Sequence, residues 1–400
     1  MVMNSREQLI AKEVKDTIAK SSSVPDELAL NAYGNKHKNL VKLHHLVEAL
    51  NLKGISVPKP CGIKSDAIQN FLQSCKPEIF DKWSNLQKNY EEYKYSGTAP
   101  FLELPEVKKN LATIDGMIYE AFSKKNAYEL LQVEGEFDLW LEEIKKRGGH
   151  LMVRSTGAED SKKAANAGGN TSVSYVSPSK KELCLALGEV VRSYFSLGSL
   201  QTRINSKENP FTSDLQLAVT VQELIGEPLG GEDDANEIPV SVVLFTNEPL
   251  YVGNESFRVM RISGTYGHGE AVVGNKGVMT DTVLILQSVT DPDKLYVLYD
   301  NEEKKTRLAP SGDSVSETVE LVKVKNPSEL FNKRVFDDEM IARLYEWGLI
   351  AECYFQEPTD MELVIKGDKI YPVQARAIVR NKQLPTYLDL KKIEENKSSY

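Results

Sequence analysis

The stretch that decides the fold is Val153-Arg154-Ser155-Thr156-Gly157-Ala158-Glu159-Asp160, in which an apolar run ends in one arginine and a loop of small residues begins. A second loop segment, Asn166-Ala167-Gly168-Gly169-Asn170, follows within a few residues. A guanidinium group matches the oxygens of a phosphate, and adjacent glycines let backbone amides approach such an anion closely. The stretch therefore suits a polyphosphate-binding loop, although an ordinary strand, turn and loop explains it equally well when it is taken alone.

Strand-like runs dominate the chain beyond this point, and two helical patterns interrupt them. The expected strands span residues 150–154, 173–176, 215–225, 240–245, 257–262, 282–286 and 295–298. One helix is expected at 181–200 because its apolar residues share one face, and another at 337–355 because acidic residues open its first turn.

The chain on the N-terminal side is mostly helical in pattern. Residues 1–30 predict an N-terminal helix and a linker, since the apolar period stops in a Ser/Pro-rich stretch. A helix is expected at 40–52, followed by a short extended piece at 55–63 that two prolines break. From about 65 to 147 almost every segment has a helical period, which indicates a helical insertion.

A second polar group falls on a hairpin predicted near the C-terminal end, with its turn at Gly367-Asp368. Residues two apart share one face of a strand, so four side chains should converge there: Asp360, Glu362, Gln374 and Arg376. Two carboxylates and an amide oxygen are hard donors that suit Mg²⁺, and an arginine beside them would neutralise a transferring phosphoryl group. A salt-bridged surface is the better interpretation for either strand alone, but the arginine loop favours a metal site.

The composition is that of a large globular protein without general attraction to nucleic acid. The 49 Lys and Arg against 58 Asp and Glu give a formal net charge of −9. No apolar run approaches the roughly 20 residues that a membrane span needs. The four cysteines form no CxxC pair. These features predict a cytoplasmic protein that binds neither nucleic acid nor membrane, with non-classical secretion left open.

Several short motifs occur in an order that resembles one known family. They are VRSTGAED with its AGG loop, VQELI (221–225), SVVLFT (241–246), GHGEAVV (267–273), DMEL (360–363) and VQARAIV (373–379), preceded by GNKHKNL (34–40) and VPKPCGI (57–63). Their order and spacing resemble the N-terminal ATP-binding domain of the phosphoenolpyruvate synthase and pyruvate phosphate dikinase family, from about residue 33 to 379. Each motif is weak singly, and the ordered set is strong.

The resemblance implies a fold class and a domain organisation. The fold would be α+β, an ATP-grasp fold in which two α+β subdomains clasp ATP. The first subdomain would span 31–214 and include the helical insertion, the second would span 215–380, and a polar tail would occupy 381–400.

The resemblance also implies the residues of an ATP and magnesium site. The ATP-binding residues would be Lys36, Arg154, Gly168, Gly169, Gln222, Glu223, Ile225 and Glu270. The Mg²⁺ ligands would be Glu362 and Gln374, supported by Asp360. The catalytic cations would be Lys36 and Arg154, which contact the phosphates, and Arg376, which steadies the transferred group.

The sequence departs from the family pattern at four loop positions. Asn35 and His37 replace two glycines, Gly169 stands where glutamine is common, and His268 replaces a leucine. A solvated loop histidine is the preferred interpretation of His268, ahead of a substrate contact.

The resemblance finally implies the activity. The complete family enzymes continue into a domain with a phosphorylated histidine and then a pyruvate barrel, and none of the five histidines here matches that carrier. We therefore expect an ATP-dependent, dikinase-like phosphotransferase that binds Mg-ATP and transfers a phosphoryl or diphosphoryl group to an acceptor outside this chain. The acceptor would be a histidine on a partner protein, another protein residue or a small molecule. The alternative is a non-catalytic ATP-binding regulatory module.

Overall fold

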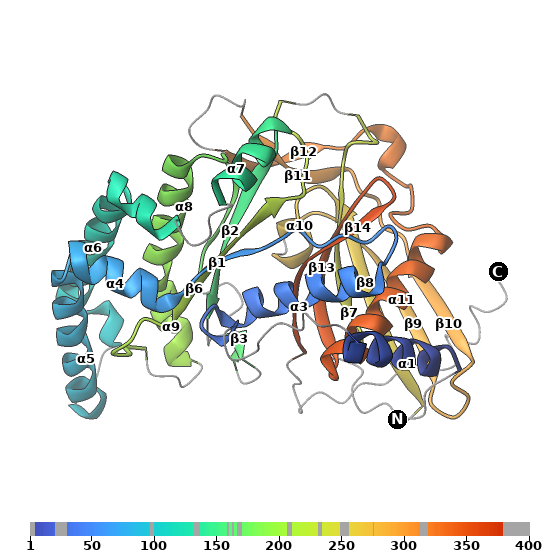
Figure 1. Ribbon diagram of the computed structural model, residues 1–400, viewed down its shortest axis with the longest axis horizontal. Coiled ribbons are helices and arrows are strands. Elements are labelled where there is room, and N and C mark those ends of the chain that lie inside the picture. The colour runs from blue at the N-terminus through green and yellow to red at the C-terminus, as the bar shows by residue number, and fades with distance from the viewer. Residues whose placement is uncertain are drawn as a thin grey trace. The chain divides into compact units, whose positions relative to one another are not determined.

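The chain forms two compact units, which are coloured by residue number in Figure 1. The computed structural model describes residues 5–20, 30–96, 100–131, 137–157, 160–161, 164–165, 170–205, 210–230, 234–248, 256–274, 276–312 and 319–378. Unit 1 comprises Met1–Val24, Leu43–Val57 and Ile225–Tyr400, and unit 2 comprises Pro25–Lys42 and Pro58–Leu224.

This division differs from the predicted subdomain boundaries in two places. The chain passes from unit 2 into unit 1 after Leu224, at the end of a strand, whereas the sequence predicts a boundary after residue 214. Residues 1–24 and 43–57 also belong to unit 1, the C-terminal unit. The tail expected at 381–400 lies outside the described residues.

Unit 2 is built on a four-stranded antiparallel sheet in the order β1-β6-β2-β5. The strands are β1 (Cys61–Ile63), β6 (Leu217–Leu224), β2 (His150–Gly157) and β5 (Ser172–Val176). Side chains of a strand alternate between its faces, so Leu151, Val153 and Val221 enter the hydrophobic core. Arg154 and Thr220, which lie opposite each other on β2 and β6, belong to the other face.

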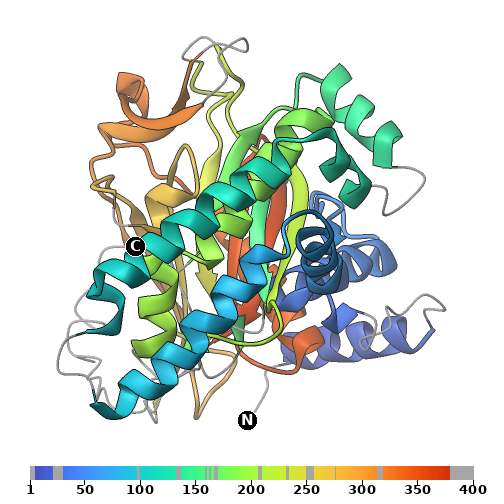
Figure 2. The same ribbon diagram turned by 90° about the vertical axis from the view of Figure 1, so that its left-hand side faces the viewer.

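Helices supply the rest of that core. They are α4 (Ser65–Cys75), α5 (Glu78–Ser96), η1 (Phe101–Glu103), α6 (Pro105–Phe122), η2 (Lys125–Leu131), α7 (Phe137–Lys146), α8 (Lys180–Tyr194) and α9 (Leu197–Asn205). Figure 2 shows the long helices α5 and α6 running side by side. The described residues between 65 and 146 are thus helical, as their period predicts.

The single helix predicted at 181–200 is wrong in one respect, because it is interrupted at Phe195 and Ser196. The hydroxyl of Ser196 accepts a hydrogen bond from the backbone amide of Ser199, which caps a new helix at this point. None of the described helices is by itself both long and apolar enough to cross a bilayer, and the bent pair α8–α9 satisfies only the length and composition requirement.

Unit 1 is built on a six-stranded antiparallel sheet in the order β10-β9-β8-β7-β13-β14. The strands are β7 (Val240–Phe245), β8 (Phe257–Tyr266), β9 (Asp281–Ser288), β10 (Leu295–Asp300), β13 (Thr359–Lys366) and β14 (Lys369–Ala377). The predicted hairpin and all the strands expected in this unit are therefore present, with shifted ends.

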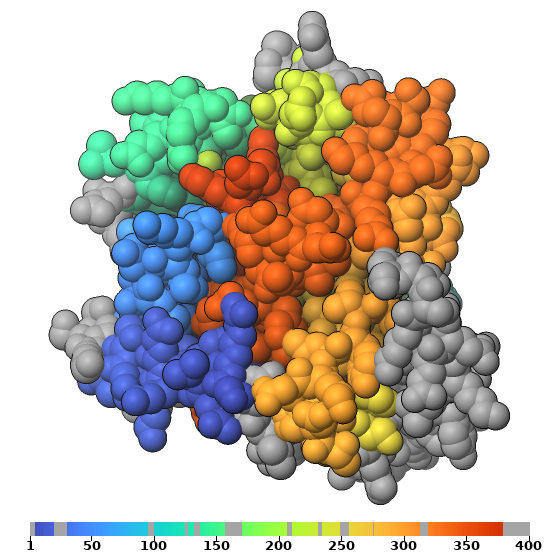
Figure 3. All heavy atoms as spheres, turned by 90° about the vertical axis from the view of Figure 1, so that its right-hand side faces the viewer, coloured from blue at the N-terminus to red at the C-terminus, as the bar shows by residue number. Residues whose placement is uncertain are grey.

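One face of this sheet is covered by α11 (Asp338–Phe355), which is capped by the Asp337 side chain, and by α1 (Ser5–Lys20). The absence of a side chain at Gly348 lets α11 approach the sheet, since a Cβ there would lie 2.8 Å from Cε of Met260. In Figure 3 the blue spheres of α1 lie beside the orange spheres of α11. Arg258 of β8 joins both helices through ion pairs with Glu7 and Glu352.

Unit 1 also holds elements that the sequence did not predict. The hairpin of β11 (Thr306–Ser311) and β12 (Glu320–Lys325) was not predicted, because proline and charged residues break the alternation of apolar and polar residues along its strands. The described residues also include four short elements: α10 (Glu270–Val273) and η4 (Ser328–Leu330) in unit 1, and β3 (Asp160–Ser161) and β4 (Ala164–Ala165) in unit 2. The extended piece expected at 55–63 is reduced to β1, because Pro58 and Pro60 have no amide hydrogen to donate.

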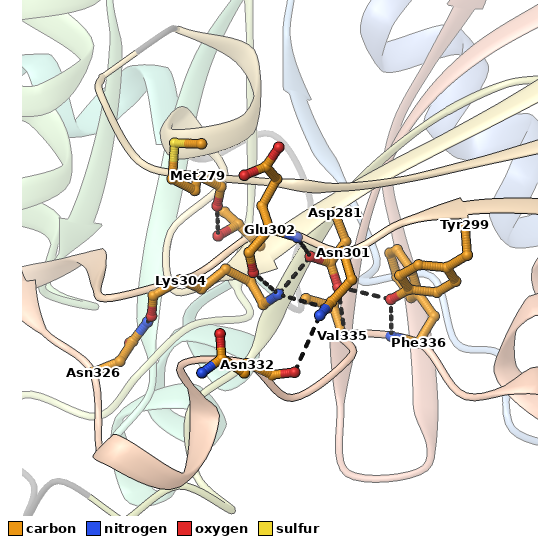
Figure 4. Close-up of polar contacts among 11 residues, drawn as sticks. Met279, Asp281, Tyr299, Asn301, Glu302, Lys304, Asn326, Asn332, Val335 and Phe336 are labelled. Carbon is orange, nitrogen blue, oxygen red and sulfur yellow. Dashed lines mark hydrogen bonds and ion pairs between the residues drawn. The ribbon is translucent and has the colours of Figure 1, made fainter.

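A fully buried ion pair links the strands of unit 1 to the loop before β11 (Figure 4). The Lys304 ammonium contacts the Asp281 carboxylate and also donates to Asn301 Oδ1 (3.2 Å) and the Glu302 carbonyl (2.6 Å). The Asp281 carboxylate accepts further hydrogen bonds from the Tyr299 hydroxyl (2.7 Å) and the Val335 amide (2.9 Å). Burial raises the pKa of Tyr299, so its hydroxyl stays protonated and remains a donor.

We expect Lys304→Met to lower the free energy of unfolding by about 3–5 kcal/mol, because it leaves the Asp281 carboxylate buried without its counter-ion. The matched control is Lys305→Met, which removes an exposed ion pair with Glu303 and should cost less than about 1 kcal/mol. Urea unfolding of the two variants measures the difference. Equal losses would show that the buried pair does not stabilise unit 1.

Candidate functional site

The hairpin of unit 1 brings the three predicted Mg²⁺ ligands together with Arg376. Asp360 lies opposite Arg376 and Glu362 lies opposite Gln374 in the register of β13 and β14. Arg376 Nε donates to Asp360 Oδ2 at 2.7 Å, and Gln374 Nε2 donates to Glu362 Oε1 at 2.8 Å. The side chains form two adjacent cross-strand rows on the face that is opposite α11.

The Asp360 carboxylate experiences two opposed effects. Burial raises its pKa, whereas the positive charge of Arg376 and the hydrogen bond from it act in the opposite direction. Asp360 is only 7% exposed, so its charge depends on this arginine.

The donor set is compatible with Mg²⁺, although it lacks a third carboxylate. No group of three or more His, Cys, Asp and Glu residues suited to a metal occurs among the described positions. Two carboxylates and one amide oxygen are nevertheless the hard donors that Mg²⁺ accepts, and this ion usually keeps several water ligands. The hydrogen bond between Gln374 and Glu362 turns the amide nitrogen toward Glu362, so the amide oxygen is the ligand that Gln374 would offer.

The loop before Glu270 lies on the same sheet face. Ser241 is two residues from Val243, the neighbour of Glu362 on β7, and its hydroxyl donates to the Gly267 carbonyl at 2.6 Å. Gly267 has φ of +90°, and a Cβ there would lie 2.3 Å from the carbonyl oxygen of Leu308. Glu270 itself is exposed and has its carboxylate 3.8 Å from Lys276.

The preferred interpretation of His268 as a solvated histidine is wrong. His268 is only 7% exposed, and its Nδ1 lies 3.3 Å from the backbone amide of Glu270. The backbone amide of His268 donates to the Leu308 carbonyl on β11, which draws the loop against that strand. The sequence could not show this burial, because it depends on the unpredicted hairpin.

The two predicted phosphate-binding cations of unit 2 are on segments that contact each other. Arg154 is on β2, and Lys36 is in the first turn of α3 (Gly34–Leu50). The hydroxyl of Thr156 on β2 accepts hydrogen bonds from the backbone amides of Lys36 (3.1 Å) and His37 (3.4 Å). A side chain from a distant strand therefore caps the start of α3.

His37 joins the helix to the sheet a second time. Its Nδ1 lies 2.6 Å from the hydroxyl of Thr220, the residue opposite Arg154 on β6. A Cβ on Gly62 would lie 2.7 Å from the His37 ring, so only glycine fits beside it. Burial lowers the pKa of His37 to about 4, and the ring is therefore neutral at physiological pH. The ring of this buried histidine therefore links the helix of Lys36 to β6, the strand that pairs with the strand of Arg154.

Three of the predicted ATP-binding residues lie at the end of β6 or directly after it. Gln222 is on the same face as Thr220 and is 2% exposed, and Glu223 pairs with Arg147 at 3.1 Å. Ile225 is the first residue of unit 1 after this strand, and the next carbonyl, that of Gly226, accepts a hydrogen bond from Lys366 at 3.0 Å. Gly168 and Gly169 lie outside the described residues.

The polar side chains that organise these residues were not identified from the sequence. Thr156 and Thr220 belong to runs that were interpreted only as strands, and Glu227 forms a buried bidentate pair with Arg307 of β11 at 2.9 and 3.1 Å. Residues two apart on a strand share a face, so the sequence alone places Thr156 on the same face as Arg154. This alternation could have identified Thr156. Nothing in the sequence pairs Glu227 with Arg307, because 80 residues separate them.

Helices packed against antiparallel sheets define the chain as an α+β protein. The comparison with known families supports this class. Residues 30–396 match the family "Pyruvate phosphate dikinase, AMP/ATP-binding domain", and the chain belongs to this family. The predicted fold class and family resemblance are thereby confirmed.

Curated relatives agree with the family assignment. A probable phosphoenolpyruvate synthase of Methanothermobacter thermautotrophicus is 27% identical over 339 residues, which cover 82% of this chain and 42% of the relative. A probable phosphoenolpyruvate synthase of Archaeoglobus fulgidus is 32% identical over 169 residues, which cover 41% of this chain and 18% of the relative. The uncharacterized phosphotransferase YvkC of Bacillus subtilis is 26% identical over 62% of this chain and 26% of its own length. The chain thus spans less than half the length of each of these relatives.

We expect the buried His37 to make the protein less stable in acid. Its pKa is 6.5 when unperturbed and about 4 in the folded state, so the unfolded chain binds the extra proton between these values. Its contribution is complete above pH 6.5 and decreases as the pH falls toward 4, by up to about 3 kcal/mol.

Thermal unfolding between pH 7 and pH 4.5 measures this effect. His37→Asn, which keeps a hydrogen-bonding group near the position of Nδ1 without the titrating ring, should flatten the acid slope. The control His44→Asn, on the same helix, should retain it. An unchanged slope in His37→Asn would show that His37 is not the group responsible.

Proposed function

We propose that the protein is an ATP-dependent phosphotransferase that binds Mg·ATP and transfers a phosphoryl or diphosphoryl group to an acceptor outside these 400 residues. Its family is an AMP/ATP-binding domain, and its relatives are named as phosphoenolpyruvate synthases and a phosphotransferase. The fold that fits this function is the ATP-grasp fold inferred from the sequence.

The single observation that carries the proposal is the pair of cross-strand rows Asp360–Arg376 and Glu362–Gln374. The presence of Glu362, Gln374 and Arg376 together argues against a module that only binds the nucleotide. Glu362, Gln374 and Asp360 would hold Mg²⁺, which supplies neutralisation of phosphate charge when it is bound. Arg376, oriented by Asp360, would stabilise the charge that develops on the transferring group.

Unit 2 would supply the cations that hold the phosphates. The Lys36 ammonium lies 3.4 Å from the Ser155 carbonyl, beside Arg154 in the chain. These two charges stand out on a chain of net charge −9, and guanidinium and ammonium groups are the usual partners of phosphate oxygens. Thr156 and His37 join the helix of Lys36 to the sheet that carries Arg154. This link would reduce the entropy cost of phosphate binding.

The acceptor is proposed to be elsewhere because no histidine here suits the role. All five histidines fall in the described residues: His37, His44, His45, His150 and His268. His37, His45 and His268 are buried, and His44 lies against the Val57 carbonyl and the Glu48 carboxylate. Burial lowers the pKa of His150. The proposed acceptor is therefore a residue of a partner protein or a small molecule, and a phosphohistidine on a partner would be acid-labile.

We expect Mg·ATP to stabilise the protein by about 2.7 kcal/mol when its concentration is ~100 times the dissociation constant. Thermal unfolding with ATP, with and without Mg²⁺, measures the effect, and EDTA supplies the control. A melting curve that millimolar Mg·ATP leaves unchanged would contradict nucleotide binding and hence the proposed function.

We expect Glu362→Gln to reduce transfer roughly 100-fold or more while sparing most nucleotide binding, because it removes a charge that acts on the metal and the reacting group. The control Asp368→Asn removes an exposed carboxylate from the turn of the same hairpin and should transfer at the parental rate. Transfer is measured as AMP or ADP formed from labelled ATP in the presence of candidate acceptors. Binding without any product, in the parent as in the variant, would favour the regulatory module.

A further inference from the structure

A second arginine lies in the same cross-strand row as Asp360 and Arg376. Reading across the sheet of unit 1, Arg261 on β8 is opposite Phe245 on β7, Phe245 is opposite Asp360 on β13, and Asp360 is opposite Arg376 on β14. Directly opposed residues of neighbouring strands share a face of the sheet. Arg261 is therefore on the face of the proposed metal site, three strands and roughly 14 Å of backbone from Arg376.

The Arg261 side chain is held in one orientation by three contacts. Its Nε donates to Glu248, which is only 2% exposed, and its Nη1 donates to Ser263 Oγ at 3.2 Å. The guanidinium carbon lies 4.7 Å from the centre of the Phe245 ring, a cation–π contact. Arg376 is held in a similar way, through its Nε by Asp360.

This arrangement leaves one end of the guanidinium available for an anion. No described residue accepts a hydrogen bond from Nη2 of Arg261, and the side chain is 32% exposed. An arginine fixed through Nε presents its terminal nitrogens to a phosphate without having to become ordered on binding. The row is also open beside it, since Phe245 and Glu362 are partly exposed.

A purely structural role for Arg261 is the competing explanation, because a buried Glu248 needs a counter-ion. That role does not account for the position of Arg261 in the same cross-strand row as Asp360 and Arg376.

We propose that Arg261 contacts the terminal phosphoryl group of the bound nucleotide and thereby distinguishes a triphosphate from a monophosphate. This inference rests on the proposed function, and it adds a phosphate-contacting residue that the sequence analysis did not identify. Phosphate oxygens approach from the open side of the row, and Arg261 and Arg376 contact them from its two ends. The ligand is thus an anionic polyphosphate chain, not the adenine or the ribose.

The test compares the affinities for Mg·ATP and AMP by titration calorimetry in the parent and in Arg261→Gln. The variant should bind Mg·ATP roughly 10- to 100-fold more weakly, as expected for loss of a hydrogen bond to a charged group, and AMP within about twofold of the parent. Arg261→Lys retains the charge and should restore part of the affinity for Mg·ATP.

The matched control is Arg258→Gln, on the same strand three residues earlier. Arg258 is on the opposite face and pairs with Glu7 and Glu352, so this variant also leaves buried carboxylates without their arginine. It should melt at a lower temperature and keep the parental ratio of Mg·ATP to AMP affinity. The double variant Glu248→Gln with Arg261→Gln removes the counter-ion role and should still lose the preference for Mg·ATP.

The outcomes separate this inference from the proposed function. A parent that binds Mg·ATP, with an Arg261→Gln variant that keeps the parental affinity ratio, overturns the role of Arg261 alone. Equal weakening of Mg·ATP and AMP in that variant also overturns it, because such a change indicates a structural role. A parent that binds neither nucleotide overturns the proposed function and this inference together.

Discussion

The alternation of side chains along antiparallel strands is the constraint on which both units depend. In each unit one face of the sheet packs against helices, and this apolar contact leaves every second residue for the other face. In unit 2 that second face holds Arg154 and Thr220, and in unit 1 it holds Arg261 and Asp360. Packing of the core and placement of the charged groups are thus two results of one pattern.

Polar groups on these faces are held by partners from neighbouring segments, and this has a chemical consequence. Arg376 is oriented by Asp360, Arg261 by Glu248, and the backbone of Lys36 by Thr156. A flexible cation on an acidic protein would lose rotational freedom when it met a phosphate, whereas an oriented one has already lost it in folding. If these groups bind phosphate as proposed, folding has already supplied part of the ordering that the binding requires.

Local patterns in the sequence predict much of this structure. The strand at 240–245, residues 257–262 of β8, the C-terminal hairpin and the helix opened by Asp337 follow from period, turn residues and capping, which are properties of adjacent residues. The four residues of the two rows could be identified for the same reason. Their roles remain predictions.

Other features depend on residues far apart in the sequence and could not be predicted. The cap of α3 comes from Thr156, 120 residues from Lys36, and the burial of His268 requires a hairpin whose own pattern is irregular. Helix α1 likewise belongs to unit 1 because it packs against α11. Nothing in the sequence of α1 specifies α11 as its partner.

The convergence of Glu362 and Gln374 depends on an irregularity that alternation alone does not include. The tight turn at Gly367-Asp368 pairs Lys366 with Lys369, and a regular register from there would place Gln374 opposite Met361, on the face packed against α11. The observed pairing shifts between Glu362 and Leu363, so that Leu363 lies opposite Pro372 and Glu362 lies opposite Gln374.

Val373 is the extra residue, and it is buried at 6% exposure. Pro372 has no amide hydrogen to lose from the ladder, which makes this a position where a bulge costs little. The bulge therefore keeps apolar pairs such as Ile365 and Ile370 in register near the turn while it moves the polar residues beyond it onto the open face. A single inserted residue in β14 thus decides that the amide and both carboxylates share one surface.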